Sequence, residues 1–325
     1  MTNNKGIWKY SKLIQYQDTT DMSVDKVLNA FDLNWNVRLW QAYAINPENN
    51  DAVSIENRWV TVRENHDKSG FPLEVVGGKY KITQNWEFID LLNGIRKAGY
   101  AEFVAGNYIK NGQGVYVIMK LNKDVSIEGD PHSSYLIART SHDGSCSVSV
   151  SPLIMRIQCT NAITSAILKA KTKYSIKHTT NNTFSLDALL AKVKLVSTHV
   201  ADYSMLANRL LNTSYSDAEF ETLLTKQFEI PSHILVAKED MLSRGDKIVR
   251  NRALNYRDYA RKAWYGDGQD TQNAIKNTRY GAFQAIIESI DHRGTEMSES
   301  QAMRIILDND SQMKDKAYSL ILQGV

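Results

Sequence analysis

Four residues in the middle of the sequence, His142, Asp143, Cys159 and His178, have side chains that could support nucleophilic catalysis. A histidine close to a cysteine can act as a general base and activate the thiol. His142 and Asp143 are adjacent in a strand-like segment, so their side chains point to opposite faces and cannot pair directly. A nucleic-acid-processing enzyme built on these residues is one hypothesis. The sequence favours the alternative, in which Cys159 is a buried structural residue.

Recognisable metal and cofactor motifs are missing from the sequence. Its seven histidines show no HxxxH or HExxH spacing, and its two cysteines do not form a CxxC pair. A metal site would have to be assembled from distant residues such as His142, Asp143 and His178. The glycines at positions 112 and 114 lack the third glycine and the Lys-Ser/Thr pair of phosphate-binding loops. We therefore expect no cofactor and no metal.

Two basic segments indicate a different chemistry. The segment from Arg139 to His178 contains six lysine and arginine residues and one acid, Asp143, so its net charge is +5. The segment from Arg244 to Lys262 contains seven such cations and two acids and also carries +5, whereas the whole chain carries only +3. Cations neutralise phosphates, and aromatic side chains stack on unpaired bases. A solvated helix face is the alternative interpretation.

The residues that we predict to bind nucleic acid come from the first segment. They are Arg139, Arg156, Lys169, Lys171, Lys173, Tyr174 and Lys177. The second segment is accompanied by the aromatic residues Tyr256, Tyr259, Trp264 and Tyr265.

These residues must be positioned by a series of strands. Segments 100–110 and 114–122 alternate and flank Asn111-Gly112, which predicts a hairpin. A third strand is expected over 134–140, and a fourth follows the Asp143-Gly144 turn, with Pro152 indicating an edge or a bulge. Thr160 or Asn161 could then cap a helix over 162–171. The first basic segment would therefore form a strand–helix wall, with Arg156 and Asn161 as internal polar ties.

The first hundred residues show weaker patterns. Residues 1–50 are irregular, apart from a strand or amphipathic edge over 35–45, and residues 58–63 alternate like a strand. Asn85 could cap a helix that ends near Gly99. The buried face of that helix would consist of Trp86, Ile89, Leu92 and Ile95.

The second half of the chain has helical periodicity. A polar linker over 178–183 precedes leucines and valines at helical spacing, and Ser216 with Glu219 forms a capping box in which Tyr215 and Phe220 could form a staple. Further helices are expected over 240–264, 269–290 and 299–307. The predicted class is α+β, with an α+β core domain over 1–180 and a helical region over 181–325 that packs on the core or extends from it.

Composition limits the class of protein. The chain has 325 residues, of which 42% are hydrophobic and 23% are charged, as in an ordinary globular protein. No apolar run approaches 18 residues, so we expect no membrane span. The polar N-terminus and the two unpaired cysteines are typical of a reducing cytoplasm.

Several stretches resemble a known family. They are VVGGKYKITQNWEFID, AGNYIKNGQGVYVIMKL, YLIARTSHDGSCSVSVSPLIMRIQCTNAI, the KHT at 177–179, and GAFQAIIESIDH at 281–292. Together they span roughly residues 30 to 295 and resemble the phage/plasmid-like protein family, a group of unknown function in phages, plasmids and bacteria. The most specific element is Arg-x-x-Cys-x-Asn at Arg156, Cys159 and Asn161. The resemblance implies DNA replication, recombination or host takeover inside a bacterial host, and it supplies no catalytic residues.

A second likeness is architectural. The order of a hairpin, further strands and a helix is similar to that of single-strand annealing proteins, which oligomerise into rings or filaments. This likeness implies a single-stranded DNA binding or annealing protein that acts as a homo-oligomer without a cofactor. A phage factor that binds a host protein through the helical half is a further alternative.

The first prediction concerns Lys169, Lys171, Lys173 and Lys177, four cations within nine residues. If each lysine neutralises one phosphate of a single strand, the log–log salt slope of binding should fall by about 0.7 for each lysine replaced by glutamine. The loss of affinity should be similar for unrelated base sequences, because phosphates carry no sequence information. Unchanged affinity and slope in the four-glutamine variant would mean that the cluster is a solvated face.

Overall fold

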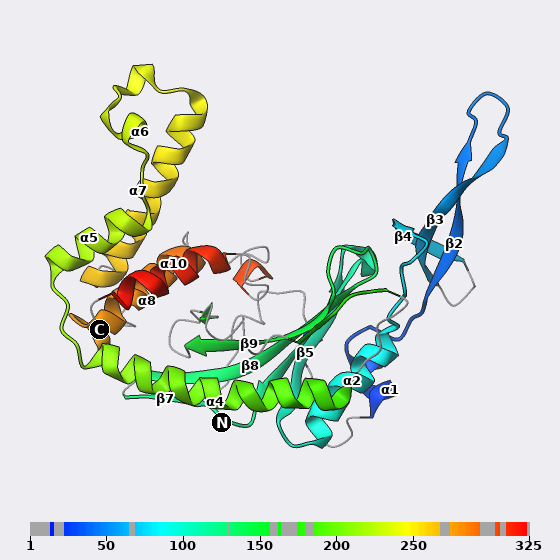
Figure 1. Ribbon diagram of the computed structural model, residues 1–325, viewed down its shortest axis with the longest axis horizontal. Coiled ribbons are helices and arrows are strands. Elements are labelled where there is room, and N and C mark those ends of the chain that lie inside the picture. The colour runs from blue at the N-terminus through cyan, green and yellow to red at the C-terminus, as the bar shows by residue number, and fades with distance from the viewer. Residues whose placement is uncertain are drawn as a thin grey trace.

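The protein is an α+β fold in which antiparallel sheets occupy the first half of the chain and helices occupy most of the second (Figure 1). The computed structural model describes residues 14–15, 23–64, 69–128, 130–156, 162–163, 174–179, 185–266, 274–292, 303–305 and 310–323. The strands are β1 (Ile14–Gln15), β2 (Val37–Ile45), β3 (Ala52–Glu64), β4 (Gly70–Gly77), β5 (Ala101–Ile109), β6 (Gly114–Leu121), β7 (Val125–Ile127), β8 (Asp130–Ser141), β9 (Val148–Arg156), β10 (Ala162–Ile163) and β11 (Tyr174–Ile176). The helices are α1 (Val24–Ala30), α2 (Asn85–Lys97), α4 (Leu186–Leu211), α5 (Asp217–Gln227), α6 (Ser232–Val236), α7 (Arg244–Tyr265), α8 (Arg279–Asp291) and α10 (Ser311–Ile321), with short 3-10 turns η2 (Lys110–Gly112) and η3 (Glu239–Met241).

The main sheet is built from consecutive hairpins, in the order β1-β5-β6-β8-β9-β10. The hairpin predicted at Asn111-Gly112 is confirmed, because β5 pairs with β6 around this turn. Asn111 and Gly112 have φ angles of 59° and 112°, in the region that asparagine and glycine tolerate best. The predicted third and fourth strands are β8 and β9, and Gly144 between them has a φ of 74°.

Both faces of this sheet are covered. In β6, for example, Val115, Val117 and Met119 join the large core on one face, whereas Tyr116 and Ile118 join a smaller cluster on the other. The alternation follows from the two-residue period of a strand. A strand buried on both faces needs apolar residues at almost every position, which explains the unbroken run of the β6 sequence.

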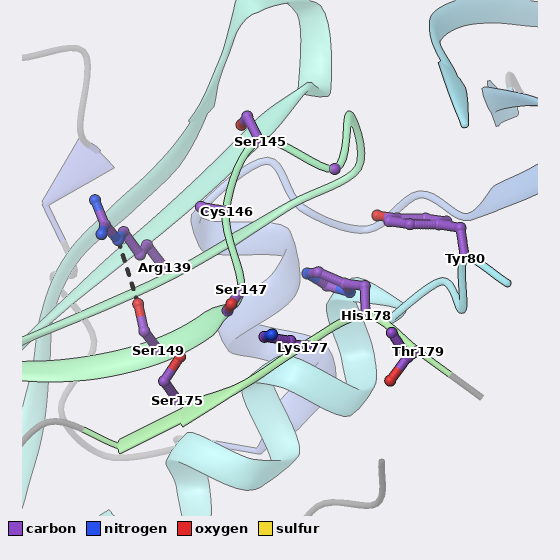
Figure 2. Close-up of a pocket in the computed structure, with 11 residues that line it drawn as sticks. Tyr80, Arg139, Ser145, Cys146, Ser147, Ser149, Ser175, Lys177, His178 and Thr179 are labelled. Atoms are coloured by element: carbon purple, nitrogen blue, oxygen red, sulfur yellow. Dashed lines mark hydrogen bonds between the residues drawn. The ribbon is translucent and has the colours of Figure 1, made fainter. Parts of the chain in front are cut away.

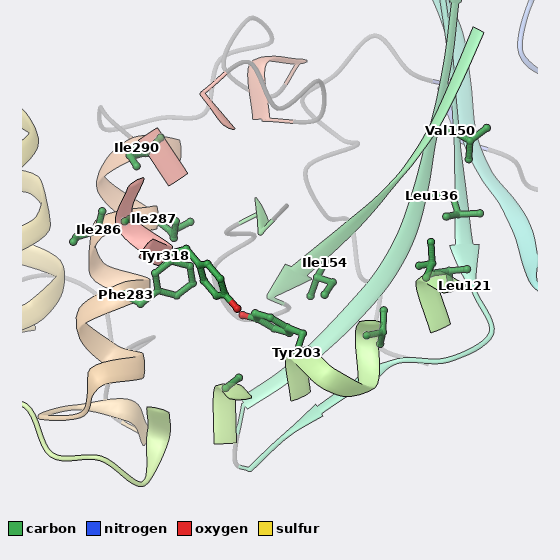
Figure 3. Packing of buried hydrophobic residues seen from close by; sticks show 14 of the residues in the cluster. Leu121, Leu136, Val150, Ile154, Tyr203, Phe283, Ile286, Ile287, Ile290 and Tyr318 are labelled. Carbon is green, nitrogen blue, oxygen red and sulfur yellow. The ribbon is translucent and has the colours of Figure 1, made fainter. Parts of the chain in front are cut away.

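The long helix α4 crosses the large-core face, and α8 and α10 extend the same core (Figure 3). Tyr203 of α4 points toward Tyr318 of α10, and Ile154 of β9 lies near them. Nearly every residue of α8 is buried, so it is the central helix of the helical half. One continuous core therefore joins the sheet to the helices.

An ion pair is buried inside this core. The Arg156 Nε lies 2.7 Å from Asp130 Oδ1 and 2.8 Å from Oδ2, and both side chains are 0% exposed. Next to it, His132 Nδ1 donates to the Asp130 carbonyl, since a carbonyl can only accept. His132 Nε2 then accepts from the Tyr280 hydroxyl at 2.9 Å, and Gln284 donates to the same hydroxyl oxygen. This network ties β8 and β9 to α8.

Several expectations for α2 need correction. The cap is Gln84 rather than Asn85, because Gln84 forms the capping box with Glu87. Asn85 instead donates to the Leu33 carbonyl. Ile89, Leu92 and Ile95 are buried as predicted, whereas Trp86 is 52% exposed.

The helix predicted to start near residue 161 is also wrong at its first residues. Ala162 and Ile163 form β10, which pairs with Met155 and Ile154 of β9. The open edge of β9 offers ladder hydrogen bonds at this point, and such tertiary pairing overrides local helix propensity. Residues 164–173 lie outside the described part. Pro152 pairs with Leu136 of β8 and lies between the residues of β9 that pair with β10 and those that pair with β11, so the strand predicted to be an edge has neighbours on both sides.

In the helical half, the observed caps and helices agree more closely with those predicted from local sequence patterns. Ser216 and Glu219 form the predicted capping box. Tyr215 and Phe220 both pack against Trp264. The helices expected over 240–264 and 269–290 correspond to α7 and α8, although α8 begins only at Arg279. Of the segment 299–307, the structure describes residues 303–305, which are helical. Helices α1 and α10 were not predicted from the sequence.

No described helix combines the length and apolarity required to cross a bilayer.

The second prediction concerns the buried ion pair. Arg156→Met or Asp130→Leu alone should lower the free energy of unfolding by about 3–5 kcal/mol, because each leaves an unpaired buried charge. The double variant should be more stable than either single variant, because it removes both charges. Urea denaturation followed by tryptophan fluorescence measures these changes.

The matched control is Arg38→Met, which removes an ion pair with Glu64 in which the arginine side chain is 70% exposed. Its loss should be below about 1 kcal/mol. Single variants at Arg156 or Asp130 with wild-type stability would contradict the prediction.

Candidate functional site

A pocket at one end of the main sheet gathers polar side chains from segments that are far apart in the sequence (Figure 2). Its volume is about 430 Å³. The lining residues are Tyr80, Arg139, Gly144, Ser145, Cys146, Ser147, Ser149, Ser175, Lys177, His178 and Thr179. Among the described residues, the lining includes two cations and several hydroxyl groups and contains no carboxylate.

Strand register positions the floor of the pocket. Arg139 of β8 lies opposite Ser149 of β9, and Ser149 lies opposite Ser175 of β11, so the three side chains share one face. Arg139 Nε donates to the Ser149 hydroxyl at 3.2 Å. No described carboxylate lies within ion-pair distance of the Arg139 guanidinium. Its charge is therefore available to a ligand.

The serine hydroxyls follow from a sequence pattern that the strand prediction did not use. In SCSVSVS, serines recur at every second position, a pattern that places alternate hydroxyls on one side of an extended chain. In the structure Ser149 lies in β9, whereas Ser145 lies in the bend before it, and both line the pocket. Val148 and Val150, on the other side, join the large core. Recognising that the alternation is between valine and serine, rather than simply strand-like, could have predicted a hydroxyl-rich surface.

His178 forms a wall of the pocket. Its ring stacks on Tyr80 with the centroids 5.3 Å apart. Nδ1 lies 3.2 Å from the Thr83 hydroxyl and Nε2 lies 3.3 Å from the Thr140 hydroxyl. Burial lowers the pKa of His178, so the ring is neutral at pH 7. The two threonine contacts hold the ring in place.

The side chain of Tyr80 is also held by a hydrogen bond. Its hydroxyl donates to the Ser141 carbonyl at 2.8 Å, and burial raises the pKa of this phenol, with a further contribution from Asp143. An isolated ladder contact between Tyr80 and Thr179 joins the segment after β4 to the segment after β11. The pocket wall is therefore preorganised.

The turn between β8 and β9 carries Asp143, which is half-buried beside the pocket but does not line it. Burial raises the pKa of Asp143, and hydrogen bonds led by those from Ser145 outweigh this effect and lower the pKa below its ordinary value. One of these bonds runs from the Ser145 amide to Asp143 Oδ1 at 2.8 Å. The ionised carboxylate is thus occupied in shaping the turn.

Of the four residues proposed for catalysis, the structure describes His142, Asp143 and His178. His142 is 0% exposed, and its Nε2 lies 3.0 Å from Asn85 Oδ1 under the ring of Trp35. Burial lowers its pKa to about 3, with the neighbouring His178 adding to the effect. Because its side chain is fully buried, this geometry does not favour the alternative in which His142 acts as a catalytic base. Cys159 lies outside the described residues.

A metal site is not supported by the described part of the chain. Within it, no three histidine, cysteine or carboxylate side chains are grouped closely enough to hold a metal ion.

The predicted nucleic-acid-binding residues divide into three groups. Arg139 and Lys177 come together in the pocket, although they are 38 positions apart. Arg156 is buried in its ion pair with Asp130 and cannot contact a phosphate, so that assignment is corrected; its role is the internal tie. Tyr174 is only 6% exposed and its hydroxyl bonds to Ser185, so its ring cannot stack on a base. The remaining predicted residues, Lys169, Lys171 and Lys173, lie outside the described residues.

The second basic segment is partly structural. Arg257 donates to the Phe228 carbonyl, and Arg261 pairs with Glu221 at 2.8 Å. Tyr256 and Trp264 are buried against α5 and the residues that follow it. Of its interleaved aromatic residues, Tyr259 is half-buried and Tyr265 is exposed. In the C-terminal half of α7, two of the three cations and two of the four aromatic residues are therefore used in internal packing.

Comparison with known proteins identifies only a family. Residues 72–316 match the family described as Domain of unknown function (DUF932), which covers more than half of the chain, so the chain belongs to that family. No curated protein and no solved structure gives a significant match.

The third prediction concerns acid sensitivity. The pKa of His142 is lower in the folded protein, at about 3, than its ordinary value of 6.5, so the unfolded chain binds more protons between these values. The contribution of His142 to stability is complete above pH 6.5 and falls by up to about 1.4 kcal/mol per pH unit as the pH drops toward 3. His132, His178 and His292 are shifted in the same direction, mainly by burial.

Urea denaturation at several pH values between 7.5 and 4.5 tests this. His142→Gln retains a donor for Asn85 but removes the titrating imidazole. The free energy of unfolding should therefore fall less steeply as the pH drops, by up to about 1.4 kcal/mol per pH unit. His233→Gln, at a site where the side chain is 73% exposed, controls for the loss of an imidazole. An unchanged slope in His142→Gln would refute the prediction.

Proposed function

We propose that this DUF932-family protein binds single-stranded DNA through the sugar–phosphate backbone, with Arg139 and Lys177 as phosphate contacts. The observation that carries the proposal is that both cations line one pocket together with serine hydroxyls, and that no carboxylate is among the described residues of its lining. Guanidinium and ammonium groups form charge-assisted hydrogen bonds with phosphate oxygens, and hydroxyls add neutral donors. Such a lining suits an anion better than a neutral ligand.

A flexible backbone suits this pocket better than a duplex. Duplex DNA has a persistence length of about 50 nm, so it cannot bend one phosphate into a recess at low cost. A single strand bends easily and can place a phosphate against Arg139 while its bases stay outside. Ser175 and Lys177 sit on the segment that follows the cations Lys169, Lys171 and Lys173 in the sequence, which could extend the contact along the strand.

Annealing of complementary strands during phage or plasmid recombination or replication is the role that we propose for this binding. It rests on two resemblances read from the sequence, one to the phage/plasmid-like family and one, in the order of a hairpin and further strands, to annealing proteins. Annealing exchanges protein–backbone contacts for base pairs and requires no cofactor. The enzyme hypothesis loses support because His142 is inaccessible.

The fourth prediction tests the two cations. Arg139→Gln and Lys177→Gln should each weaken binding of a labelled unstructured oligonucleotide and lower the log–log salt slope by about 0.7, and the double variant by about 1.4. Fluorescence anisotropy over a salt series measures both quantities. Inorganic phosphate should compete with the oligonucleotide more strongly on the wild-type protein than on the double variant.

Lys226→Gln is the matched control, because Lys226 is an exposed cation on α5, far from the pocket. It should leave the slope unchanged. Wild-type affinity and slope in the Arg139/Lys177 double variant, with folding verified by circular dichroism, would rule out this pocket as the backbone site.

A further inference from the structure

Two projections extend from opposite ends of the molecule (Figure 1). One, which we call the β-arm, is the outer part of the β2–β3 hairpin, residues 40–57. The other, which we call the helical arm, contains α6, η3 and the first half of α7, residues 232–254. Neither projection contains any residue of the pocket.

The β-arm exposes large apolar side chains. Tyr43 is 56% exposed, Ile45 66% and Val53 67%, and Trp40 and Ile55 are also exposed. The β4 strand pairs with β3 only between Arg58 and Glu64, so the hairpin beyond this point is a ribbon of two strands. An isolated two-stranded hairpin is at best marginally stable in water. The register puts Tyr43 and Ile45 on one face of the ribbon and Val53 on the other, so apolar side chains are exposed on both faces. Exposed apolar residues in this number on a marginal ribbon are typical of an interaction site.

The helical arm has the same property. Val236 is 82% exposed, Met241 76% and Leu235 63%, and Ile248 and Val249 on α7 are also exposed. Isolated surface leucines are ordinary, but a group of this size on one projecting element is typical of an interaction site.

The charges of the two arms are opposite. The β-arm contains the acids Glu48, Asp51 and Glu56 and no lysine or arginine. The helical arm contains five lysine and arginine residues and three acids, a net charge of +2. None of the three β-arm acids forms an ion pair with a described residue, and the same is true of Arg244, Lys247 and Arg252 on the helical arm. Each arm therefore offers unpaired charge that the other can neutralise.

We infer that the β-arm of one copy binds the helical arm of the next copy, so that the chain assembles head to tail. Pairing of like arms would bring three uncompensated acids against three others, whereas unlike pairing joins opposite charges around two apolar surfaces. The two surfaces differ and lie at opposite ends, so each contact leaves one arm of each kind unoccupied. Repetition produces a ring if the rotation closes and a filament if it does not.

A charge-exchange experiment tests this without nucleic acid, so its result is independent of the pocket. In one variant Glu48, Asp51 and Glu56 are replaced by lysine, and in a second variant Arg244, Lys247 and Arg252 are replaced by glutamate. In each variant alone the two arms carry the same sign, so assembly at micromolar concentration should be lost. In an equal mixture each arm again meets the opposite sign, and assembly should return with the two variants alternating.

Sedimentation velocity gives the size of the assemblies, and mass spectrometry of the native mixture gives their composition. Asp90→Lys/Lys97→Glu, which reverses two exposed charges on α2, should assemble like the wild type. Val53→Asp and Ile248→Asp should each weaken assembly at least tenfold while leaving the thermal unfolding of the main sheet intact.

Three outcomes would overturn the inference. They are a monomeric wild-type protein at micromolar concentration, variants that assemble like the wild type, or a mixture that stays monomeric although both variants are folded. A monomeric protein whose helical-arm variant loses only oligonucleotide binding would assign that arm to nucleic acid instead, and one whose arm captures a host protein would assign it to that partner.

Discussion

The buried ion pair between Arg156 and Asp130 constrains the rest of the structure. Neither charge can be taken out of water alone, so β8 and β9 must pair in the register that brings these groups together. The same register places His132 where its ring accepts from Tyr280, and this bond joins the sheet to the central helix of the helical half. The position of α8, and of the helices packed on it, therefore depends on a polar contact that the apolar core alone would not specify.

At the other end of the same two strands, an arginine is left without a carboxylate partner among the described residues. Arg139 and Arg156 both occupy these strands, but Asp130 neutralises only Arg156, and Arg139 has serine hydroxyls beside it instead of a carboxylate. One arginine has thus become part of the core, and the other retains a positive field at the pocket. The rigid ladder between them connects the two roles, because the contacts that fix the register at Arg156 also set the positions of Ser149 and Ser175 beside Arg139. An anion site built on strands in this way is held more precisely than one built on loops.

Local signals in the sequence were sufficient for some of these features and insufficient for others. The turn at Asn111-Gly112 and the cap at Ser216 depend on a few neighbouring residues, and both appear as predicted. The burial of Arg156 depends on a partner 26 positions away, in a stretch with no strong pattern, so the sequence predicts Arg156 both as a phosphate contact and as an internal tie and does not decide between the two. The pocket could not be predicted in this way, because its residues Arg139, Lys177 and Tyr80 are distant in the sequence. They are brought together by the pairing of β11 with β9 and by the Tyr80–Thr179 contact. Trp86 fitted a buried helical face by spacing, but spacing does not reveal how wide that face is.

The two proposals are linked, because assembly through the arms would repeat the pocket along a bound strand. A single pocket that contacts one or two phosphates binds weakly and loses affinity rapidly as salt rises. Head-to-tail assembly repeats the pocket at a regular spacing, and one strand that reaches two pockets makes its second contact intramolecularly, at an effective concentration that can reach the millimolar range. Affinity would then grow with strand length, without any base-specific contact. The arms expose apolar surface in an isolated copy. In the assembly that surface would be covered, and the arms would align weak anion sites so that one flexible polyanion contacts several of them.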